Sequence, residues 1–205
     1  LLGPSGCGKT TLLNIIAGLC KPTTGTVKVR GELVTGPGKG KGVVFQQYAL
    51  YPWLTVEKNV EFGMRMKGVP KAERAEIAKK YIDLVGLSKF AKAYPKELSG
   101  GQQQLLAFAK VLLTRPKLLL LDEATKGLDT EAKLMVAKLC RALTAEGVTI
   151  VMATHDLPFT ACAADAITML FDGEDACTET PSEFFHNNLF YRATENDFTR
   201  AWGSL

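Results

Sequence analysis

The sequence lacks the cysteine patterns that mark disulfide frameworks and zinc sites. Its five cysteines are odd in number, lie far apart along 205 residues, and form no CxxC pair. This distribution argues against both a set of structural disulfides and a zinc ribbon, and it favours a reducing compartment. The five are Cys7, Cys20, Cys140, Cys162 and Cys177.

Long apolar runs are also missing. No stretch approaches the roughly 18–20 residues that cross a bilayer as a helix, and no secretory signal pattern is visible. Hydrophobic residues make up 46% and charged residues 22%, which is the composition of an ordinary globular domain rather than a disordered chain. If the protein serves a membrane, we expect other chains to form the channel.

Charge is distributed unevenly, but without the aromatic platform typical of nucleic-acid binding. Residues 1–100 carry 16 Lys and Arg against 7 Asp and Glu, whereas residues 101–205 carry 9 against 14. The lysines of the basic half are spread over helical and loop stretches, which favours solvated helix faces over a nucleic-acid footprint. No nucleic-acid partner is expected.

Apolar runs alternate with segments of helical periodicity along most of the chain. The expected strands span residues 26–29, 42–45, 118–121, 148–153 and 166–171. Helices are expected at residues 10–18 and 130–146 and after residue 155, and the pattern is helical from about 56 to 114. This alternation predicts an α/β fold in which a mostly parallel sheet is flanked by helices and interrupted by an inserted all-α subdomain. No internal repeat is found.

A glycine-rich stretch, GPSGCGKT at residues 3–10, matches the phosphate-binding P-loop pattern in full. Its glycines let backbone N–H groups turn inward around a phosphate, and the helix that follows adds partial positive charge at its N-terminus. Lys9 is expected to reach the terminal phosphates, and the hydroxyl of Thr10 to ligate Mg²⁺. The expected nucleotide contacts are Gly3, Pro4, Ser5, Gly6, Cys7, Gly8, Lys9, Thr10 and Thr11.

Two adjacent carboxylates follow a run of four leucines, LLLLDE at residues 118–123. The leucines predict a buried strand, and ligands of open α/β sheets lie at the carboxyl ends of strands. Asp122 is expected to contact the Mg²⁺ shell. Glu123 is expected to polarise the attacking water, because hydrolysis needs a base aligned with the γ-phosphate.

A second helix start with anion-binding character lies at residues 98–102, LSGGQ. One small domain cannot grip a γ-phosphate with both this start and the P-loop if the two lie far apart. We therefore expect a partner subunit to place this helix start over the other subunit's P-loop. Taken alone, a serine and two glycines favour a plain helix cap. The expected contacts are Ser99, Gly100, Gly101 and Gln102.

The combination of these motifs resembles the ATP-binding cassette (ABC) ATPases, in which LSGGQ is the defining signature. The order of P-loop, signature, Asp-Glu pair and downstream histidine is that of the family over essentially the whole chain. The resemblance implies that Gln46 senses Mg²⁺ and the attacking water. It also implies that His155 contacts the γ-phosphate, and that Asp129 belongs to the loop linking two sites across a dimer.

The resemblance implies an ATPase that uses ATP and Mg²⁺, that pairs head to tail with a second cassette, and that powers a membrane transporter. Residues 48–54, from Tyr48 to Leu54, resemble the segment that receives the transmembrane permease subunit; unaided, they predict a buried aromatic cluster. The implied location is peripheral, on the cytoplasmic face of the membrane. The alternatives are a soluble ABC ATPase acting on nucleic acid or ribosomes, and a nucleotide-gated dimerisation module.

The implied organisation is a P-loop core at residues 1–52 and 115–180, a helical signature subdomain at 53–114, and a C-terminal helical tail at 181–205. The family's N-terminal strands are missing from the sequence, so we expect the chain to be a fragment. Gln103 and Gln104 stand where arginines commonly follow the signature, and Ala124 replaces the usual proline.

The two halves of the chain resemble different branches of the family. Residues 1–102 resemble nitrate, sulfonate and taurine-type importer ATPases through GVVFQQYALYPWLTVEKNVEFG. From about residue 103, DEATKGLD, MLFDGE and FFHNNLFY resemble the energy-coupling-factor importer ATPases for cobalt and vitamins. A recombined, engineered or misassembled chain is the hypothesis that accounts for this change.

Overall fold

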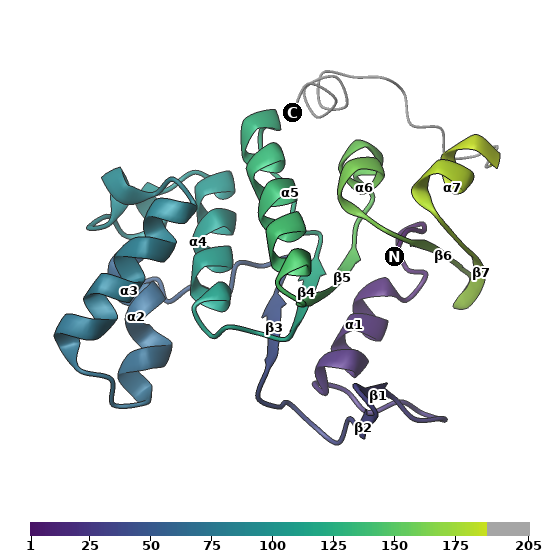
Figure 1. Ribbon diagram of the computed structural model, residues 1–205, viewed down its shortest axis with the longest axis horizontal. Helices are drawn as coiled ribbons and strands as arrows, with labels where there is room; N and C mark the ends of the chain where they lie inside the picture. Colours follow the sequence, from purple (N-terminus) through teal and green to yellow (C-terminus); the bar gives the residue numbers. More distant parts are fainter. Residues whose placement is uncertain (188–205) are drawn as a thin grey trace.

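The computed structural model describes residues 1–187, and helices and strands alternate along them (Figure 1). The helices are α1 (Lys9–Ala17), α2 (Val56–Met66), α3 (Lys71–Leu84), α4 (Gly100–Leu112), α5 (Thr130–Ala145), α6 (Leu157–Ala163) and α7 (Pro181–Asn187), with short 3₁₀ turns η1 (Ser88–Phe90) and η2 (Pro95–Glu97). The strands are β1 (Lys28–Val29), β2 (Glu32–Leu33), β3 (Lys41–Val44), β4 (Leu118–Asp122), β5 (Thr149–Ala153), β6 (Ile167–Phe171) and β7 (Glu174–Glu179).

A parallel sheet in the order β3-β4-β5 forms the centre of the molecule. Every residue of β4 is buried, and its four leucines alternate between the two faces of the sheet. Leu118 and Leu120 pack with Leu13 of α1, whereas Leu119 and Leu121 pack with the cluster that includes residues of α4 and α5. Each fully buried leucine contributes roughly 1.5–3 kcal/mol of hydrophobic stabilisation, so β4 anchors both layers of helices.

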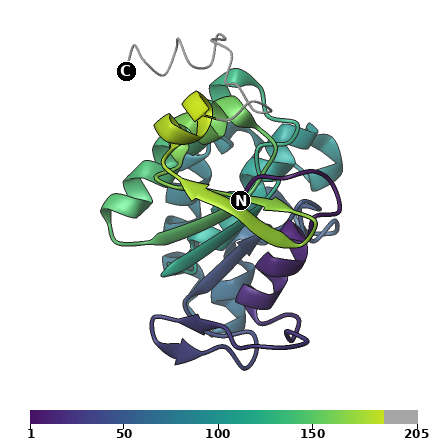
Figure 2. The same ribbon diagram turned by 90° about the vertical axis from the view of Figure 1, so that its right-hand side faces the viewer.

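The first two residues of the chain lie between the parallel sheet and the β6–β7 hairpin. Leu1 exchanges backbone hydrogen bonds with Met152 and Thr154 around β5, and Leu2 pairs in parallel with Met169 of β6. Figure 2 shows this N-terminal segment beside the hairpin. The P-loop therefore starts from the middle of the strand layer.

Helices α2, α3 and α4 pack against one another and form a lobe on one side of the sheet (Figure 1). Phe108 of α4 is completely buried in the core that joins this lobe to β4 and α5. Helix α4 also packs against β3. The expected all-α insertion is thus present, and it shares one continuous apolar core with the sheet.

The fold expected from the sequence is confirmed in its class, and most element boundaries agree within two residues. Two strands were not predicted: β2, and β7, whose sequence EDACTE carries charged side chains on an exposed edge. Both pair antiparallel with the preceding strand, β1 or β6, so the strand layer is mixed rather than parallel throughout. The expected strand at residues 26–29 is reduced to β1. Of the expected tail, residues 188–205 lie outside the described part of the chain, as does part of FFHNNLFY.

Candidate functional site

The P-loop connects Leu2 to helix α1 through a tight backbone path. Gly3 has a φ of 149°, and a Cβ at this position would lie 2.2 Å from the carbonyl oxygen of Leu170. Gly8, the residue directly before α1, has a φ of 97°, and no side chain caps the helix. Only glycine fits these positions without strain, and the N–H groups of the first turn of α1 are left for a ligand.

The Lys9 side chain bends back over the loop. Its Nζ donates hydrogen bonds to the carbonyl oxygens of Gly3, at 2.8 Å, and of Pro4, at 3.0 Å. The ammonium is therefore held at the centre of the loop, where the backbone turns. A fixed cation beside free helix N–H groups suits the terminal phosphates of a nucleotide.

Thr10 and Asp122 join the start of α1 to the end of β4. The Thr10 hydroxyl donates to Asp122 Oδ1 at 3.1 Å, and the Asp122 side chain is buried. Burial raises the pKa of the Asp122 carboxyl, the Thr10 hydrogen bond opposes that rise, and the neighbouring charge of Glu123 adds to it. A hydroxyl and a carboxylate in contact form the hard oxygen donor set that suits Mg²⁺.

Glu123 turns the chain at the end of β4. Its φ is 50°, in the left-handed region that non-glycine residues rarely adopt, and its N–H donates to the carbonyl of Ala153 at 2.8 Å. Adjacent residues of a regular strand point to opposite faces of the sheet. Because the backbone turns at Glu123, Asp122 and Glu123 can both lie at the same end of the sheet, where they contact Thr10 and His155. Strained backbone of this kind is concentrated at functional sites.

His155 follows β5 and meets Glu123. Its Nδ1 lies 2.7 Å from Glu123 Oε2, and the histidine side chain is 72% exposed while the glutamate is 14% exposed. The Glu123 carboxylate is thus mostly covered by the protein, whereas most of the His155 ring is in contact with solvent. Gln46 is exposed two residues after the end of β3. Neighbouring parallel strands therefore bring Gln46, Glu123 and His155 to one edge of the sheet.

The signature residues form a complete N-terminal cap on α4. The Ser99 hydroxyl accepts from the Gln102 N–H at 3.2 Å, and the Gln102 side chain accepts from the Ser99 N–H at 2.9 Å. Gly101 packs against the backbone of Gly127, whose oxygen lies 3.0 Å from the site of a Cβ. Asp129 caps α5 by accepting from the Ala132 N–H at 2.8 Å.

The signature and the P-loop are not brought together within one chain. Helix α1 packs on one face of the sheet with Leu118 and Leu120, whereas α4 packs on the other with Leu119 and Leu121. The expected site residues thus form two groups. One group gathers Lys9, Thr10, Asp122, Glu123 and His155; the other lies at the starts of α4 and α5 and contains Ser99, Gly100, Gly101, Gln102 and Asp129.

Residues 48–54 form a surface segment held from below by a buried asparagine. The Asn59 side chain accepts from the Tyr51 N–H at 2.8 Å and donates to the carbonyls of Tyr51, Leu54 and Thr55. The Tyr51 ring packs against Phe62 with ring centres 4.2 Å apart and planes tilted by 40°, and Trp53 is 69% exposed. The aromatic cluster is thus only partly buried.

The ammonium group of Lys110 contacts residues 49–51, and this contact was not predicted from the sequence. Lys110 of α4 donates to the Ala49 carbonyl at 2.6 Å and lies 4.1 Å from the centre of the Tyr51 ring. Burial lowers the pKa of the Lys110 ammonium. No sequence signal identifies Lys110 or Asn59, because each acts through a contact made only in the folded chain. Helix α4 therefore connects the signature at its start with this segment along its length.

Neither a protein-only metal cluster nor a membrane-spanning helix is found in the described part of the chain. Within residues 1–187 no three or more His, Cys, Asp and Glu side chains are arranged to hold a metal ion. None of the helices described here combines the length and apolar character needed to cross a bilayer. A Mg²⁺ ion held by few protein oxygens plus phosphates needs no such cluster.

Curated relatives with similar sequences are ATP-binding proteins. An uncharacterized ABC transporter ATP-binding protein of Methanocaldococcus jannaschii is 48% identical over 171 residues, which cover 83% of this chain and 64% of that protein. A nitrate import ATP-binding protein of Synechocystis is 52% identical over 132 residues, or 64% of this chain and 50% of that one. This chain thus spans less than two thirds of the length of these relatives. The archaeal match extends past residue 102 on both sides, and the recombined-chain hypothesis stays a prediction.

Solved structures with the same fold are ABC cassettes. A dimeric ATP-binding cassette in a post-hydrolysis state with ADP and Pi superposes with a TM-score of 0.81 and 34% identity, covering 88% of this chain and 83% of that one. A component of the cbiONQ ABC transporter complex from Clostridium perfringens superposes with a TM-score of 0.79 and 27% identity, covering 90% of this chain and 78% of that one.

The family assignment rests on a match that covers more than half of the sequence. Residues 1–126 match the family model described as ABC transporter, and this range includes the P-loop, the signature and the Asp122–Glu123 pair. The fold and the geometry of the strand ends agree with it. The chain belongs to the ABC transporter family.

Proposed function

We propose that this chain binds and hydrolyses ATP as one cassette of an ABC importer, and that hydrolysis drives transport through permease subunits in the membrane. The observation that carries the proposal is the group of side chains at the carboxyl edge of the sheet. There Thr10 contacts Asp122 at 3.1 Å, while Glu123 contacts His155 at 2.7 Å. Relatives named for nitrate import and bicarbonate transport support the role in import.

The roles follow from the chemistry of each side chain. Lys9 exchanges its carbonyl partners in the loop for terminal phosphate oxygens, and the N–H groups at the start of α1 bind the remaining phosphate oxygens. Glu123 accepts the proton of the attacking water. Its carboxylate is mostly shielded from bulk solvent and is held in place by His155. His155 lies beside that carboxylate, and its exposed ring contacts the γ-phosphate.

Mg²⁺ is the cofactor that the site fits. Thr10 and Asp122 would hold it directly, with Gln46 completing the set from the end of β3. When bound, the ion supplies positive charge to the phosphate oxygens as the terminal bond breaks. The Thr10 hydroxyl and Asp122 are already in contact, so little rearrangement is needed to accept an oxygen-coordinated cation.

A second copy of the cassette completes the site. The signature cap at Ser99 and the P-loop lie on opposite faces of one sheet, so a single chain leaves each without the other. A head-to-tail pair places Ser99–Gln102 of each copy over the P-loop of the other, and Asp129 lies in the loop beside the signature. The dimeric cassette with ADP and Pi supports pairing.

The permease docks on residues 48–54, which places the cassette on the cytoplasmic face of the membrane as a peripheral protein. Support comes from the 69% exposed Trp53 on a backbone fixed by Asn59. The same segment touches α4 through Lys110 and Gly100, since a Cβ on Gly100 would lie 3.1 Å from the Tyr48 hydroxyl. A displacement of residues 48–54 by the permease is therefore transmitted to α4, the helix that carries the signature.

Replacing the base separates hydrolysis from binding. We expect Glu123→Gln to lower ATP turnover by about two to four orders of magnitude, while nucleotide-dependent dimers accumulate because ATP is not consumed. Turnover is measured by phosphate release and dimers by size exclusion with light scattering. Lys9→Ala is the contrasting variant: it should weaken ATP binding itself, and no dimers should form. Unchanged turnover in Glu123→Gln would remove Glu123 from its role.

Neutralising Asp122 tests the metal site through stability as well as activity. Burial disfavours the ionised form of the Asp122 carboxyl and raises its pKa, so Asp122→Asn should raise the melting temperature of the nucleotide-free chain by about 2–4 °C. The stabilisation that MgATP adds in the wild-type chain should then be lost, with ATP in EDTA as the reference for both. Asp172→Asn, exposed in the turn between β6 and β7 and outside the site, is the matched control and should retain the MgATP effect. A full MgATP effect in Asp122→Asn would contradict the assignment.

Mixing two inactive variants tests the head-to-tail arrangement. Lys9→Ala disables a P-loop and Ser99→Arg disables a signature, so each homodimer should be inactive. In a mixed dimer both defects fall on one site and the other site is intact. An equal mixture should therefore regain about a quarter of wild-type turnover if the two sites act independently. No recovery after confirmed subunit exchange would mean that each chain supplies both groups to its own site.

Removing the exposed ring tests permease docking. Trp53→Ala should leave the melting temperature and the basal ATPase activity of the isolated cassette within error, because the side chain is mostly in solvent. Co-purification with the permease subunits and transport in vesicles should both fall by about tenfold or more. Met66→Ala, equally exposed at 71% on α2, is the control. Normal co-purification of Trp53→Ala would place the docking surface elsewhere.

A further inference from the structure

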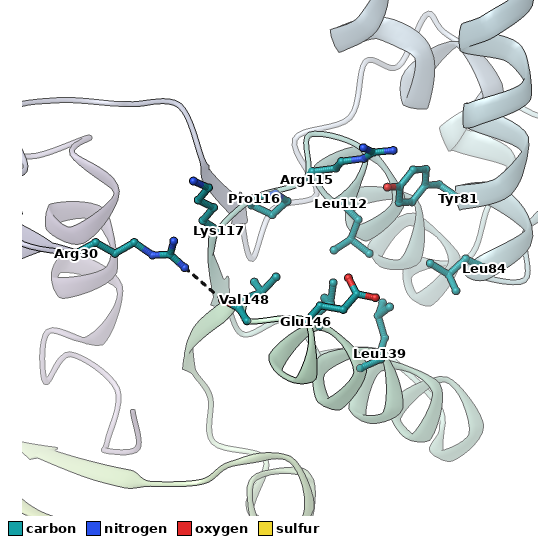
Figure 3. A pocket seen from close by; sticks show the side chains of 13 residues that line it. Arg30, Tyr81, Leu84, Leu112, Arg115, Pro116, Lys117, Leu139, Glu146 and Val148 are labelled. Atoms are coloured by element: carbon teal, nitrogen blue, oxygen red, sulfur yellow. Dashed lines mark hydrogen bonds between the residues drawn. The ribbon is translucent and has the colours of Figure 1, made fainter.

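A cavity of about 590 Å³ opens at the edge of the sheet opposite to the nucleotide-binding edge. It lies where α3, α4 and α5 end and where β4 and β5 begin. Leu112, Leu139 and Val148 line it between polar side chains (Figure 3). A cavity of this size that combines apolar and charged side chains suits a small molecule with both characters.

The polar lining is predominantly cationic. Arg30 and Lys117 lie on one side of the cavity and Arg115 on the other, with Glu146 as the acidic side chain between them (Figure 3). Among residues 1–187, no carboxylate lies within 4.0 Å of any of the three cations. Arg30 uses one N–H group on the carbonyl of Gly147, at 3.2 Å, and the rest of its fork remains available.

The two arginines stand at backbone positions that favour other residues. Arg30 and Gly31 make the two-residue turn between β1 and β2, with φ values of 53° and 84°, where Asn-Gly is strongly preferred. Arg115, two residues beyond the C-cap of α4, has a φ of 49°, in the left-handed region that glycine and asparagine adopt most readily. Each placement strains the backbone of a residue that carries a Cβ, and both side chains line the same cavity.

We propose that this cavity binds an organic anion with an apolar body, such as a sulfonate, carboxylate or phosphate attached to a ring system. Arg30, Arg115 and Lys117 bind the charged group, for which guanidinium forks are suited to pairs of oxygens. The leucines and Val148 enclose the rings. Such a ligand offsets the unpaired cations and makes use of arginines whose backbone conformations are otherwise unfavourable.

The cavity does not overlap the proposed ATP site, but it is lined by the same helices and strands. Helix α4 runs from Ser99 at its cap to Leu112 in the cavity, and α5 runs from Asp129 to Glu146. Strand β4 starts after Lys117 and ends at Asp122. A ligand here therefore contacts the far ends of the elements that carry the signature, the catalytic carboxylates and the interface loop.

The test uses 8-anilinonaphthalene-1-sulfonate as the probe, titrated by calorimetry into the full-length protein. We expect one saturable site that persists in the presence of MgATP and in Lys9→Ala. N-phenyl-1-naphthylamine, which has the same rings without the sulfonate, should bind at least about tenfold more weakly. Competition between the sulfonate and ATP, or equal affinity for the neutral probe, would overturn the proposal.

The variants exploit the backbone strain to separate binding from folding. Arg30→Asn and Arg115→Asn place a residue that tolerates positive φ at each turn, so melting temperatures should stay the same or rise. The double variant should weaken sulfonate binding about tenfold or more. Arg65→Asn, an exposed arginine on α2 outside the cavity, removes one charge as a control and should bind as the wild type does. Wild-type affinity in the double variant would overturn the assignment.

Discussion

Parallel pairing of β3, β4 and β5 is the constraint from which the arrangement of the site follows. Register pairs Val44 with Leu121 and Asp122 with Ala153, so the three strands end at nearly the same level. Gln46, the Asp122–Glu123 pair and His155 are carried by the residues directly beyond those ends. The Thr10–Asp122 contact then ties the start of α1 to the same edge. Thr10 and Asp122, more than a hundred positions apart in the sequence, meet because the hydrogen-bonded register of the strands fixes where each strand ends.

Burial of β4 on both faces has a second consequence. A strand that is apolar on each side must be covered by two layers of helices, and the chain supplies α1 for one face and α4 and α5 for the other. The phosphate-binding loop and the signature cap are therefore separated by the sheet itself. This separation, rather than any missing residue, is why a second copy is needed in the proposed mechanism. The close approach of Gly101 to Gly127 keeps the signature beside the loop that leads into α5.

The two ends of the sheet differ in how polar groups are held. At the nucleotide edge the charged groups find partners within the chain: Lys9 with loop carbonyls, Thr10 with Asp122, and Glu123 with His155. At the opposite edge Arg115 and Lys117 find none among the described residues, and Arg30 finds only a backbone carbonyl. Left-handed backbone at Glu123 on one edge and at Arg30 and Arg115 on the other marks both edges as places where side-chain position outweighs local preference.

Local chemistry was sufficient to predict much of the fold from the sequence. The four leucines before Asp122 predicted a buried strand, because nothing but a two-sided core accepts such a run, and the P-loop glycines predicted a turn that only glycine adopts. Helical periodicity predicted α5, which extends over Thr130–Ala145 against an expected 130–146. The strand β7 was not predicted, because its charged residues are tolerated only on the exposed edge that β6 provides.

The tertiary structure alone decided how the pieces are combined. The left-handed turn at Glu123 depends on the Ala153 carbonyl of the next strand, and Asn59 and Lys110 act through contacts with residues 49–55 that their sequence neighbours do not reveal. The cation-lined cavity gathers residues from four stretches of the chain, which include the β1–β2 turn and the ends of α3, α4 and α5. By itself the sequence predicted which residues carry phosphate and metal chemistry, since that prediction depends on side-chain type and local backbone freedom. Which of them lie together at one edge of the sheet, and which lie with α4 and α5 on its other face, was decided by the pairing of strands, because pairing is non-local.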